Sequence, residues 1–475
     1  MCASQFSASR SGKPYAGIPG FWVATVVNID WPSAGGIPWA EQKEEFRSLL
    51  AYYKSLNMNA AIVQIRTAGD AFYPSELAPW STYLTGKQGQ APDTEEDPLL
   101  WMIQETHRQG MEFHAWLNPY RATFDDRLDQ LAPTHDVLRH PEWMIAYGGK
   151  YYYDPGLPEV QEHLQNIIRE VVENYPIDAI HFDDYFYPYK VEGETFGDAA
   201  SYARLAREGQ SLEDWRRENV NKLIASLHAT IKELKPYVQF GISPFGVWRN
   251  QDRDPRGSAT QAGQTNYDDL YADALAWMEA GTVDYMLPQL YWSMDYAPAS
   301  HRVLVDWWAK YADKCLVYIG NGPYKIRNNA DEAWDDPQEI PRQLALTRQD
   351  PRISGNAFFS AKSFPAQPDV AEILREGLYA APALVPVLPG APAAAKLPEM
   401  RVKKAGQEFQ VDFAAPLPEE INRVVYFQPK GRVQELASVH YIELEEDRMR
   451  GQWARNQKNG LKWAFMDAYG QIIYP

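Results

Sequence analysis

The sequence predicts an α/β fold, a (β/α)8 TIM barrel followed by a small β-sandwich-like C-terminal domain. Short apolar runs alternate with helix-length amphipathic segments along most of the 475 residues, a pattern typical of parallel strands joined by crossover helices. Eight such units close into a barrel, and about 360 residues suit that fold when its loops are long. The predicted strands are Phe21–Asp30, Asn59–Thr67, Glu112–Asn118, Asp178–Asp184, Gln239–Ser243, Asp284–Tyr291, Leu316–Asn321 and Gly355–Lys362.

A helical segment follows each predicted strand. An open doubly wound sheet is the competing architecture, but it rarely needs eight evenly paced units. No Gly-rich phosphate-binding pattern follows the first strand either, and such a pattern marks the dinucleotide-binding form of that sheet. The predicted helices cover residues 41–57, 97–110, 157–175, 211–235, 266–280, 299–313, 337–348 and 368–378.

The chain divides into four parts by composition. A polar N-terminal tail, 1–14, precedes the barrel domain, 15–380. Residues 381–397 form a Pro/Ala-rich stretch that reads as a semi-rigid linker. The small β-rich accessory domain, 398–475, is too short to be a catalytic domain of its own, and its short alternating segments predict strands at Glu408–Phe413, Asn422–Phe427, Ser438–Leu444 and Leu461–Asp467.

Charge and composition narrow the classes of partner. The net charge is −17, without a Lys/Arg-rich cluster, so we expect neither nucleic acid nor an anionic membrane surface as a partner. Mean hydropathy is −0.48, and the absence of an apolar stretch of about 18 residues argues against a transmembrane helix. Neither a C-x-x-C nor an H-E-x-x-H pattern occurs, so no cofactor or metal is expected.

The N-terminal residues suggest that a signal peptide has been removed. Cys2 precedes a polar run and is one of only two cysteines, with Cys315. We expect an exported protein, periplasmic or an outer-membrane lipoprotein, attached to the membrane only through a lipid on Cys2. The alternative is an ordinary cytosolic start with an incidental cysteine.

Polar residues occupy the inward positions at the C-terminal tips of the predicted strands. Strand alternation turns Val27 and Ile29, like Ile180 and Phe182, toward the outer helices. A barrel built only for stability would fill the inward tips with aliphatic side chains, and active sites of this fold lie at that face. A self-satisfied polar network is the alternative. The inward set is Asn28, Asp30, Gln64, Arg66, His114, Trp116, Asn118, His181, Asp183, Ser243, Gln289, Tyr291, Ser360 and Lys362.

Aromatic residues gather in the predicted exit loops, and aromatic residues make up 13% of the chain. Their flat faces suit the apolar faces of sugar rings, although any single one could serve loop packing instead. As a set they predict an elongated sugar-binding cleft. They are Tyr120, Tyr151, Tyr152, Tyr153, Tyr185, Phe186, Tyr187, Tyr189, Trp248, Tyr291, Trp292 and Tyr324.

Five carboxylates are candidates for glycosidic chemistry, which needs a proton donor and a second group opposite it. Asp183, inward by alternation, is the first choice. Asp184 would be the second carboxylate if the backbone turns there, and otherwise would cap or pair with Arg66 or Arg121. A nearby arginine lowers a carboxylate's pKa and a neighbouring carboxylate raises it. The other candidates are Asp30, Asp70 and Asp295.

His114 and His181 are the two histidines predicted to face inward. Each could orient a carboxylate or hydrogen-bond a sugar hydroxyl. The equally weighted alternative is a hydrogen-bonded core histidine in each case.

Seven ordered motifs resemble the glycoside-hydrolase-like family 10, over roughly residues 15–380. The resemblance is specific because the motifs are many and in order, and it does not extend to the C-terminal residues. The motifs are FWVATVVNIDWPS (21–33), LNMNAAIVQIRTAGDAFYPSELAPWS (56–81), FHAWLNPYR (113–121), HPEWM (140–144), IDAIHFDDYFYPY (177–189), GISPFGVWRN (241–250) and VDYMLPQLYWS (283–293).

The resemblance implies a (β/α)8 barrel of the bacterial envelope, and one member type is a lipoprotein that cuts peptide-free peptidoglycan strands. It implies that Phe182–Asp184, Asp30 and Asp70 line the site and that Arg66, Asn118 and Gln289 bind substrate. Together with strand alternation, this gives Asp183, Asp184 and Asp30 as the catalytic candidates. DAIHFDDY is also faintly similar to the chitinase strand-four motif, but Tyr185 replaces the terminal Glu, so help from the substrate's N-acetyl group stays open. Substrate-binding candidates are Arg66, Asp70, Tyr73, His114, Asn118, Tyr120, Arg121, His181, Tyr185, Trp248, Gln289, Tyr291 and Trp292.

The sequence therefore predicts a glycoside hydrolase of a bacterial glycan, with peptide-free peptidoglycan as the leading substrate. A hydrolase of another polysaccharide is the first alternative, since barrels change substrate through their loops. A non-catalytic glycan-binding protein is the second, because fold does not guarantee chemistry.

Overall fold

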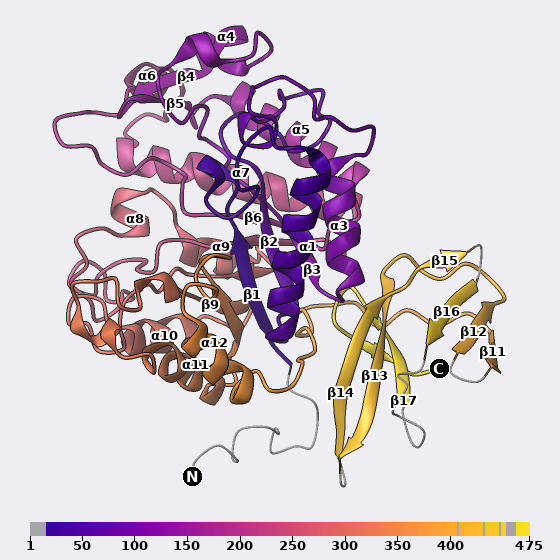
Figure 1. Ribbon diagram of the computed structural model, residues 1–475. Coiled ribbons are helices and arrows are strands. Elements are labelled where there is room, and N and C mark those ends of the chain that lie inside the picture. Colours follow the sequence, from indigo (N-terminus) through magenta and orange to yellow (C-terminus); the bar gives the residue numbers. More distant parts are fainter. Residues whose placement is uncertain (1–15, 406–407, 431–432, 446–447, 453–461) are drawn as a thin grey trace.

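The computed structural model describes residues 16–405, 408–430, 433–445, 448–452 and 462–475. Eight parallel strands close into a barrel in the order β1-β10-β9-β8-β7-β6-β3-β2, as the sequence predicts (Figure 1). The predicted lipid-bearing Cys2 and its tail lie outside the described residues. The barrel strands are β1 (Ile18–Val23), β2 (Ala60–Arg66), β3 (Glu112–Leu117), β6 (Ala179–Phe182), β7 (Gln239–Ile242), β8 (Tyr285–Met286), β9 (Leu316–Asn321) and β10 (Ile353–Phe358).

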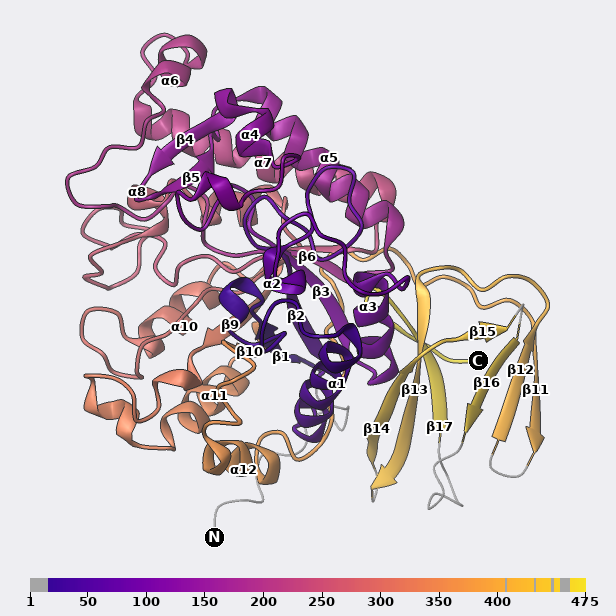
Figure 2. The ribbon, with the colours of Figure 1, turned by 45° about the horizontal axis from the view of Figure 1, so that its top comes forward.

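Helices surround the barrel, as Figure 2 shows from a second direction. The predicted helix at 266–280 is interrupted and forms α8 and α9. Among the described helices, none is both long and apolar enough to cross a membrane. The helices between and after the barrel strands are α1 (Trp39–Ser55), α3 (Pro98–Arg108), α5 (Pro158–Asn174), α7 (Leu212–Leu234), α8 (Asn266–Asp269), α9 (Ala274–Ala280), α10 (His301–Ala309), α11 (Glu339–Gln349) and α12 (Pro368–Glu376).

Smaller elements build the loops at the C-terminal ends of the strands. An antiparallel hairpin, β4 (Met144–Tyr147) and β5 (Lys150–Tyr153), stands in the loop between β3 and β6. These long loops were expected from the sequence, but their elements were not. The remaining short helices are α2 (Thr82–Thr85), α4 (Asp136–Arg139), α6 (Ala199–Leu205), η1 (Val26–Asn28), η2 (Leu128–Gln130), η3 (Pro141–Trp143), η4 (Pro323–Lys325) and η5 (Glu332–Asp335).

The first strand is the clearest error of the sequence prediction. It ends at Val23, and the chain then turns through η1, where Val27 has a φ of 53°. Val27 and Ile29 are 54% and 38% exposed, so they do not face the outer helices. The physical reason is local: the Asp30 carboxylate accepts a hydrogen bond from the Ala24 amide at 2.8 Å and bends the chain back.

Alternation predicts the facing of β2, β3 and β6 well, but β8 keeps only Tyr285–Met286 of the predicted Asp284–Tyr291, and β10 ends at Phe358 before the predicted end at Lys362. Val63, Ala115 and Ile180 belong to the large core between strands and helices, whereas Ile62 and Trp116 fill the barrel interior. Arg66 departs from the prediction, because the register of β2 against β3 shifts just before it. Its guanidinium leaves the axis and donates to the Tyr153 hydroxyl at 3.2 Å.

The C-terminal residues form two four-stranded antiparallel sheets, β11-β12-β16-β15 and β14-β13-β17-β18. Phe413 and Met449 of one sheet pack with Val424 and Phe465 of the other, as in a β-sandwich. Figures 1 and 2 both place this module beside α3, away from the β4–β5 hairpin. Its strands are β11 (Met400–Ala405), β12 (Glu408–Phe413), β13 (Ile421–Lys430), β14 (Val433–Tyr441), β15 (Leu444–Glu445), β16 (Arg448–Gln452), β17 (Lys462–Asp467) and β18 (Ile472–Ile473).

Candidate active site

Two adjacent carboxylates lie at the C-terminal end of β6, on the floor of the barrel mouth. The strand ends at Phe182, and the backbone then turns, with the Phe186 amide donating to the Asp184 carbonyl at 3.1 Å. Because of this turn, the two side chains do not point to opposite faces as in a strand. Asp183 is held from the β3 side and Asp184 from the β8 side of the mouth.

Within the described residues, the donors to Asp183 are neutral. The Asn118 amide donates to its Oδ2 at 2.5 Å and the Trp116 indole donates to the same atom at 3.2 Å. The Tyr185 amide reaches Oδ1 at 3.3 Å. Asn118 is in turn fixed by Gln64, whose side-chain amide donates to it at 2.6 Å. These neutral donors therefore fix the position of the carboxyl group.

Asp184 is held by different neighbours. The Gln289 amide donates to its Oδ1 at 3.3 Å and also to the Ser243 carbonyl at 3.0 Å. The Tyr189 hydroxyl donates to Oδ2. Tyr189 was recognised in the sequence only as one of many loop aromatics, because nothing in the spacing shows which of them reaches a carboxylate.

The pKa values of both carboxyl groups are raised above the usual value for aspartate. Burial raises the pKa of Asp183 to about 7, with a further contribution from the negative charge of Asp184, while Arg121 opposes both. Burial also raises the pKa of Asp184, against the hydrogen bonds from Tyr189 and Gln289. Two like charges in one buried site resist simultaneous ionisation, so the pair favours holding a single proton near neutral pH. One carboxyl group of the pair is then protonated and can act as an acid, while its neighbour is ionised and can act as a base.

Arg121 is the nearby cation that acts on both carboxylates. Its guanidinium carbon lies 4.3 Å from the centroid of the Tyr185 ring, in a cation–π arrangement. It is 6% exposed. Arg121, rather than Arg66, is therefore the arginine that tunes the acid pair.

Asp30 lies at the rim, where the first and last barrel strands meet. Its carboxylate accepts from the Ser360 hydroxyl at 2.7 Å and from the Lys362 amide at 3.0 Å, in addition to Ala24. Burial raises its pKa, although these hydrogen bonds and the Lys362 charge oppose the rise. These hydrogen bonds connect the loop that follows β1 with the loop that follows β10. The first role of Asp30 is therefore to stabilise the rim of the mouth.

An aromatic wall follows β8, β9 and β10. Tyr291, Tyr324 and Phe359 pack against one another with ring centroids 6.0 to 6.2 Å apart. Tyr324 is 40% exposed, and Tyr291 and Phe359 are half-buried. Charges of both Asp183 and Asp184 contribute to the raised pKa of Tyr291, after the effect of burial. The wall therefore stands beside the acid pair and offers apolar faces to a sugar ring.

Trp292 is half-buried and adjoins this wall in the sequence. Its ring meets that of Phe245 edge to face at 5.5 Å. The other residues around the carboxylates are Phe359 of the aromatic wall, Trp116, which donates to Asp183, and Ser360, which donates to Asp30. The sequence placed Trp116 and Ser360 inward without giving them partners, and Phe359 received no role.

Several predicted substrate-binding residues serve the packing of loops instead. Asp70 accepts from the Thr67 and Ala68 amides at 2.8 and 2.9 Å and so caps its own turn. Tyr73 and Tyr120 are 1% and 0% exposed, which leaves no face for a sugar. Each of these side chains, like Arg66, stabilises the walls of the mouth from behind.

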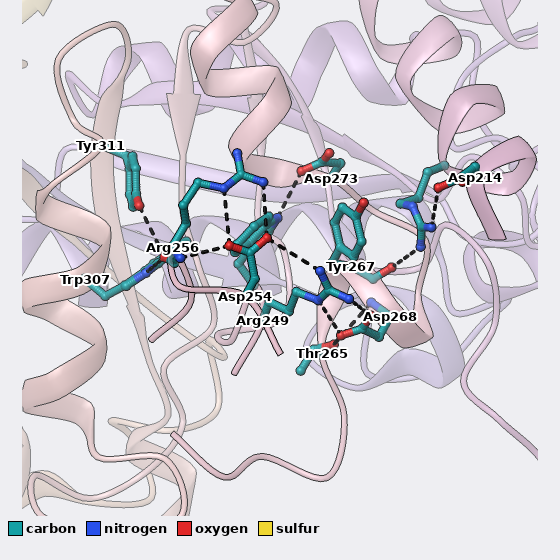
Figure 3. Close-up of polar contacts among 12 residues, drawn as sticks. Asp214, Arg249, Asp254, Arg256, Thr265, Tyr267, Asp268, Asp273, Trp307 and Tyr311 are labelled. Atoms are coloured by element: carbon teal, nitrogen blue, oxygen red, sulfur yellow. Dashed lines mark hydrogen bonds and ion pairs between the residues drawn. The ribbon is translucent and has the colours of Figure 1, made fainter. Parts of the chain in front are cut away.

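Trp248 is also fully buried, in the loop that follows β7. Its indole donates to Asp273 at 3.0 Å, and the Arg256 guanidinium lies 5.1 Å from its ring centroid. Figure 3 shows the ion pairs that fix this loop, including Arg249 with Asp254 and Asp268. These contacts connect the loop with α8, α9 and α10, and the buried Trp248 ring leaves no face for a sugar.

His114 and His181 lie inside the barrel, as predicted, but below the mouth. Both are at most 1% exposed, and both hydrogen-bond the Tyr285 hydroxyl at 2.9 Å. Burial holds the pKa of His181 well below its usual range. The alternative of hydrogen-bonded core histidines therefore describes them. Among the described residues, no three His, Cys, Asp or Glu side chains gather as metal ligands.

Comparison with known proteins identifies the family of the chain. A family model described as glycosyl hydrolase-like 10 matches residues 17–336. The glycosyl hydrolase YngK of Bacillus subtilis is 48% identical over 399 residues, which cover 82% of this chain and 78% of that protein. The glycosyl hydrolase DigH of Escherichia coli is 36% identical over 376 residues, covering 74% of this chain and 84% of that protein.

Among solved structures, the glycoside hydrolase domain of PgaB from Bordetella bronchiseptica is similar with a TM-score of 0.49 and 12% identity. The similarity covers 76% of this chain and 99% of that domain.

Proposed function

The chain belongs to the glycosyl hydrolase-like 10 family, and on that premise we propose that it hydrolyses glycosidic bonds in an amino-sugar glycan, with peptide-free peptidoglycan strands as the substrate. The observation that carries the proposal is the buried pair Asp183 and Asp184, of which Asp183 has a pKa near 7. A carboxylic acid that keeps its proton near neutral pH is what protonation of a leaving glycosidic oxygen requires.

The environments of the two carboxyl groups divide their roles. Asp183, with its raised pKa, is the general acid. Asp184 accepts from Tyr189 and Gln289, which favour its ionised form. An ionised carboxylate beside the anomeric carbon stabilises the positive charge that develops there. It could act directly or by orienting the N-acetyl group of the substrate.

The mouth fits the proposed substrate class by its chemistry. The exposed Tyr324 and half-buried Tyr291 suit the faces of pyranose rings. Lys362 is exposed at the rim beside Asp30, where its ammonium could meet the lactyl carboxylate of a muramic acid residue. Peptide stems would widen the strand, which is the reason to propose glycan from which they have been removed. The proposal includes export to the cell envelope, where this polymer lies.

The experiment is a digestion of purified peptidoglycan with and without prior amidase treatment, with new reducing ends as the readout. Release only from the pretreated glycan is the expected result. A parallel panel of chitin oligomers, deacetylated glucosamine polymers and neutral polysaccharides tests the substrate class. Cleavage of another panel member alone would replace peptidoglycan by that glycan.

Asp183→Asn is the matched inactive variant, because amide and carboxyl have nearly the same shape. If wild type and this variant bind the glycan equally and neither releases reducing ends, the protein is a glycan-binding module and the hydrolase proposal fails.

A further inference from the structure

A chain of buried polar side chains runs through the barrel from the C-terminal module to the residues beneath the acid pair. It starts at Arg423 of β13, whose Nη1 donates to Glu112 Oε1 at 2.7 Å across the junction of module and barrel. Every member is at most 2% exposed, so the polar atoms depend on one another for hydrogen bonds. This axial chain consists of Arg423, Glu112, His114, Tyr285, His181 and Ser243.

The links of the axial chain are all short. Glu112 Oε2 lies 3.0 Å from His114 Nε2, and the Tyr285 hydroxyl lies 2.9 Å from Nδ1 of each histidine. His181 Nε2 lies 3.0 Å from Ser243 Oγ. Gly241 makes room for the Tyr285 ring, since a Cβ there would stand 1.9 Å from its Cζ. The glycine at position 241 therefore leaves space for the Tyr285 side chain to place its hydroxyl on the barrel axis.

The donor and the acceptor of each hydrogen bond in the axial chain can be assigned from the groups at its two ends. The Trp22 indole N–H can only donate, and it points to His181 Nε2 at 3.3 Å. His181 therefore carries its proton on Nδ1 and donates it to the Tyr285 oxygen. Tyr285 must then donate to His114 Nδ1, and His114 donates from Nε2 to the Glu112 carboxylate. All donors point toward Glu112, which is the partner of Arg423.

The upper end of the axial chain touches the support of the acid pair. His181 lies in β6, two residues before Asp183, which follows the strand, and the Ser243 amide donates to the Phe182 carbonyl at 2.8 Å. The Ser243 carbonyl accepts from Gln289, the same amide that holds Asp184. A displacement of His181 or Ser243 is therefore transmitted to both carboxyl groups.

We propose that Arg423 is a positioning residue for the reaction: by pairing with Glu112 it fixes the direction of the axial chain and holds the acid pair in its working geometry. This inference rests on the proposed hydrolase function. It makes the C-terminal module a structural part of the catalytic unit. Without the guanidinium, the buried Glu112 carboxylate would keep the hydrogen bond from His114, but its charge would no longer be balanced by Arg423. A chain reversed so that His114 accepts from Glu112 would aim an N–H of His181 at the N–H of Trp22.

Arg423→Met tests the proposal because it removes the charge and keeps the length of the side chain. We expect kcat to fall at least about tenfold with KM within about twofold, the split expected when positioning rather than binding is lost. Arg423→Lys keeps the charge and should stay within about threefold of wild type. The double variant Arg423→Met/Glu112→Gln should recover most of the lost kcat, since the glutamine oxygen accepts from His114 without needing a cation.

Tyr441→Phe is the matched control at the same junction. Its hydroxyl donates to Asp178 at 2.7 Å, outside the axial chain. This variant should lower the melting temperature while keeping kcat. Full kcat in folded Arg423→Met, or a double variant no better than the single one, would overturn the proposal.

Nitrogen-15 spectra of the histidines provide a readout that does not need activity. In wild type we expect the Nε2–H tautomer for His114 and the Nδ1–H tautomer for His181. The opposite tautomers would overturn the proposal even if Arg423→Met did not fold. If wild type cleaves no glycan but shows these tautomers, the proposed hydrolysis fails while the chain order stands.

Discussion

Replacing Asp183 by asparagine should remove most activity and yet stabilise the fold above neutral pH. In the folded protein, burial and the Asp184 charge raise the pKa of Asp183 from 3.8 to about 7. The folded state therefore binds this proton more tightly than the unfolded chain. The wild-type free energy of unfolding falls as pH rises from about 4 to about 7, and the loss is complete above that range.

The size of the effect follows from the shift. About three pKa units correspond to ~4 kcal/mol, since one unit is about 1.4 kcal/mol. The asparagine amide will face the Tyr185 N–H, which offsets part of the gain by ~1 kcal/mol for an imperfect hydrogen bond. We therefore expect Asp183→Asn to be more stable than wild type by about 2–3 kcal/mol at pH 8, and less stable by ~1 kcal/mol near pH 4, where only the imperfect hydrogen bond remains.

Urea unfolding followed by tryptophan fluorescence at pH 4.5, 6, 7 and 8 measures this difference. Asp295→Asn is the control, because that side chain is 79% exposed and its substitution should change the free energy of unfolding little. A pH-independent difference for Asp183→Asn would refute the assignment of a raised pKa. In the same variant kcat should drop at least about a hundredfold, the low end for a positioned acid, and wild-type turnover would remove Asp183 from the reaction.

Three further predictions concern the surroundings of the pair. Tyr189→Phe removes a hydroxyl that favours ionised Asp184, so the acid limb of the kcat/KM profile should move to higher pH; an unmoved limb would contradict this role. Tyr324→Ala should raise KM about tenfold with little change in kcat, from ~1.4 kcal/mol of lost ring contact, as measured by initial rates on the cleaved glycan. Arg216→Met breaks the buried 2.6 Å ion pair with Asp198 that clamps the loop after β6 and should lower stability by about 3–5 kcal/mol in denaturant unfolding.

Period-two alternation made the barrel and the position of Asp183 predictable. In β6 the apolar Ile180 and Phe182 face the helices, and this alone sends His181 and Asp183 inward. The same rule failed after Val23, because Val27 and Ile29 continue an alternation that the backbone does not follow. A pattern of side chains cannot show that one carboxylate, Asp30, bonds a nearby amide and ends the strand.

The partners of the acid pair could not be predicted for a different reason. Asn118, Gln289 and Tyr189 meet the pair from separate loops, and the choice depends on how those loops fold. Trp248 shows the reverse case, an exit-loop aromatic that the structure buries. The contact between Arg423 and Glu112 joins residues 311 positions apart in two different sheets, and no local pattern encodes it.

The barrel treats its buried carboxylates differently at its two ends, and this contrast supports the assignment of the site. At the N-terminal end, Asp178 is buried, which would raise its pKa, but His107 and Arg423 lower the pKa below the usual value. Glu112 there has Arg423 as a direct partner. At the mouth, the donors that the described part of the chain brings to Asp183 and Asp184 are neutral, and burial leaves the pKa of each raised. Cations therefore pair with the carboxylates whose charge must be neutralised for folding. The carboxyl groups at the mouth, which must exchange a proton, are bonded by neutral donors instead.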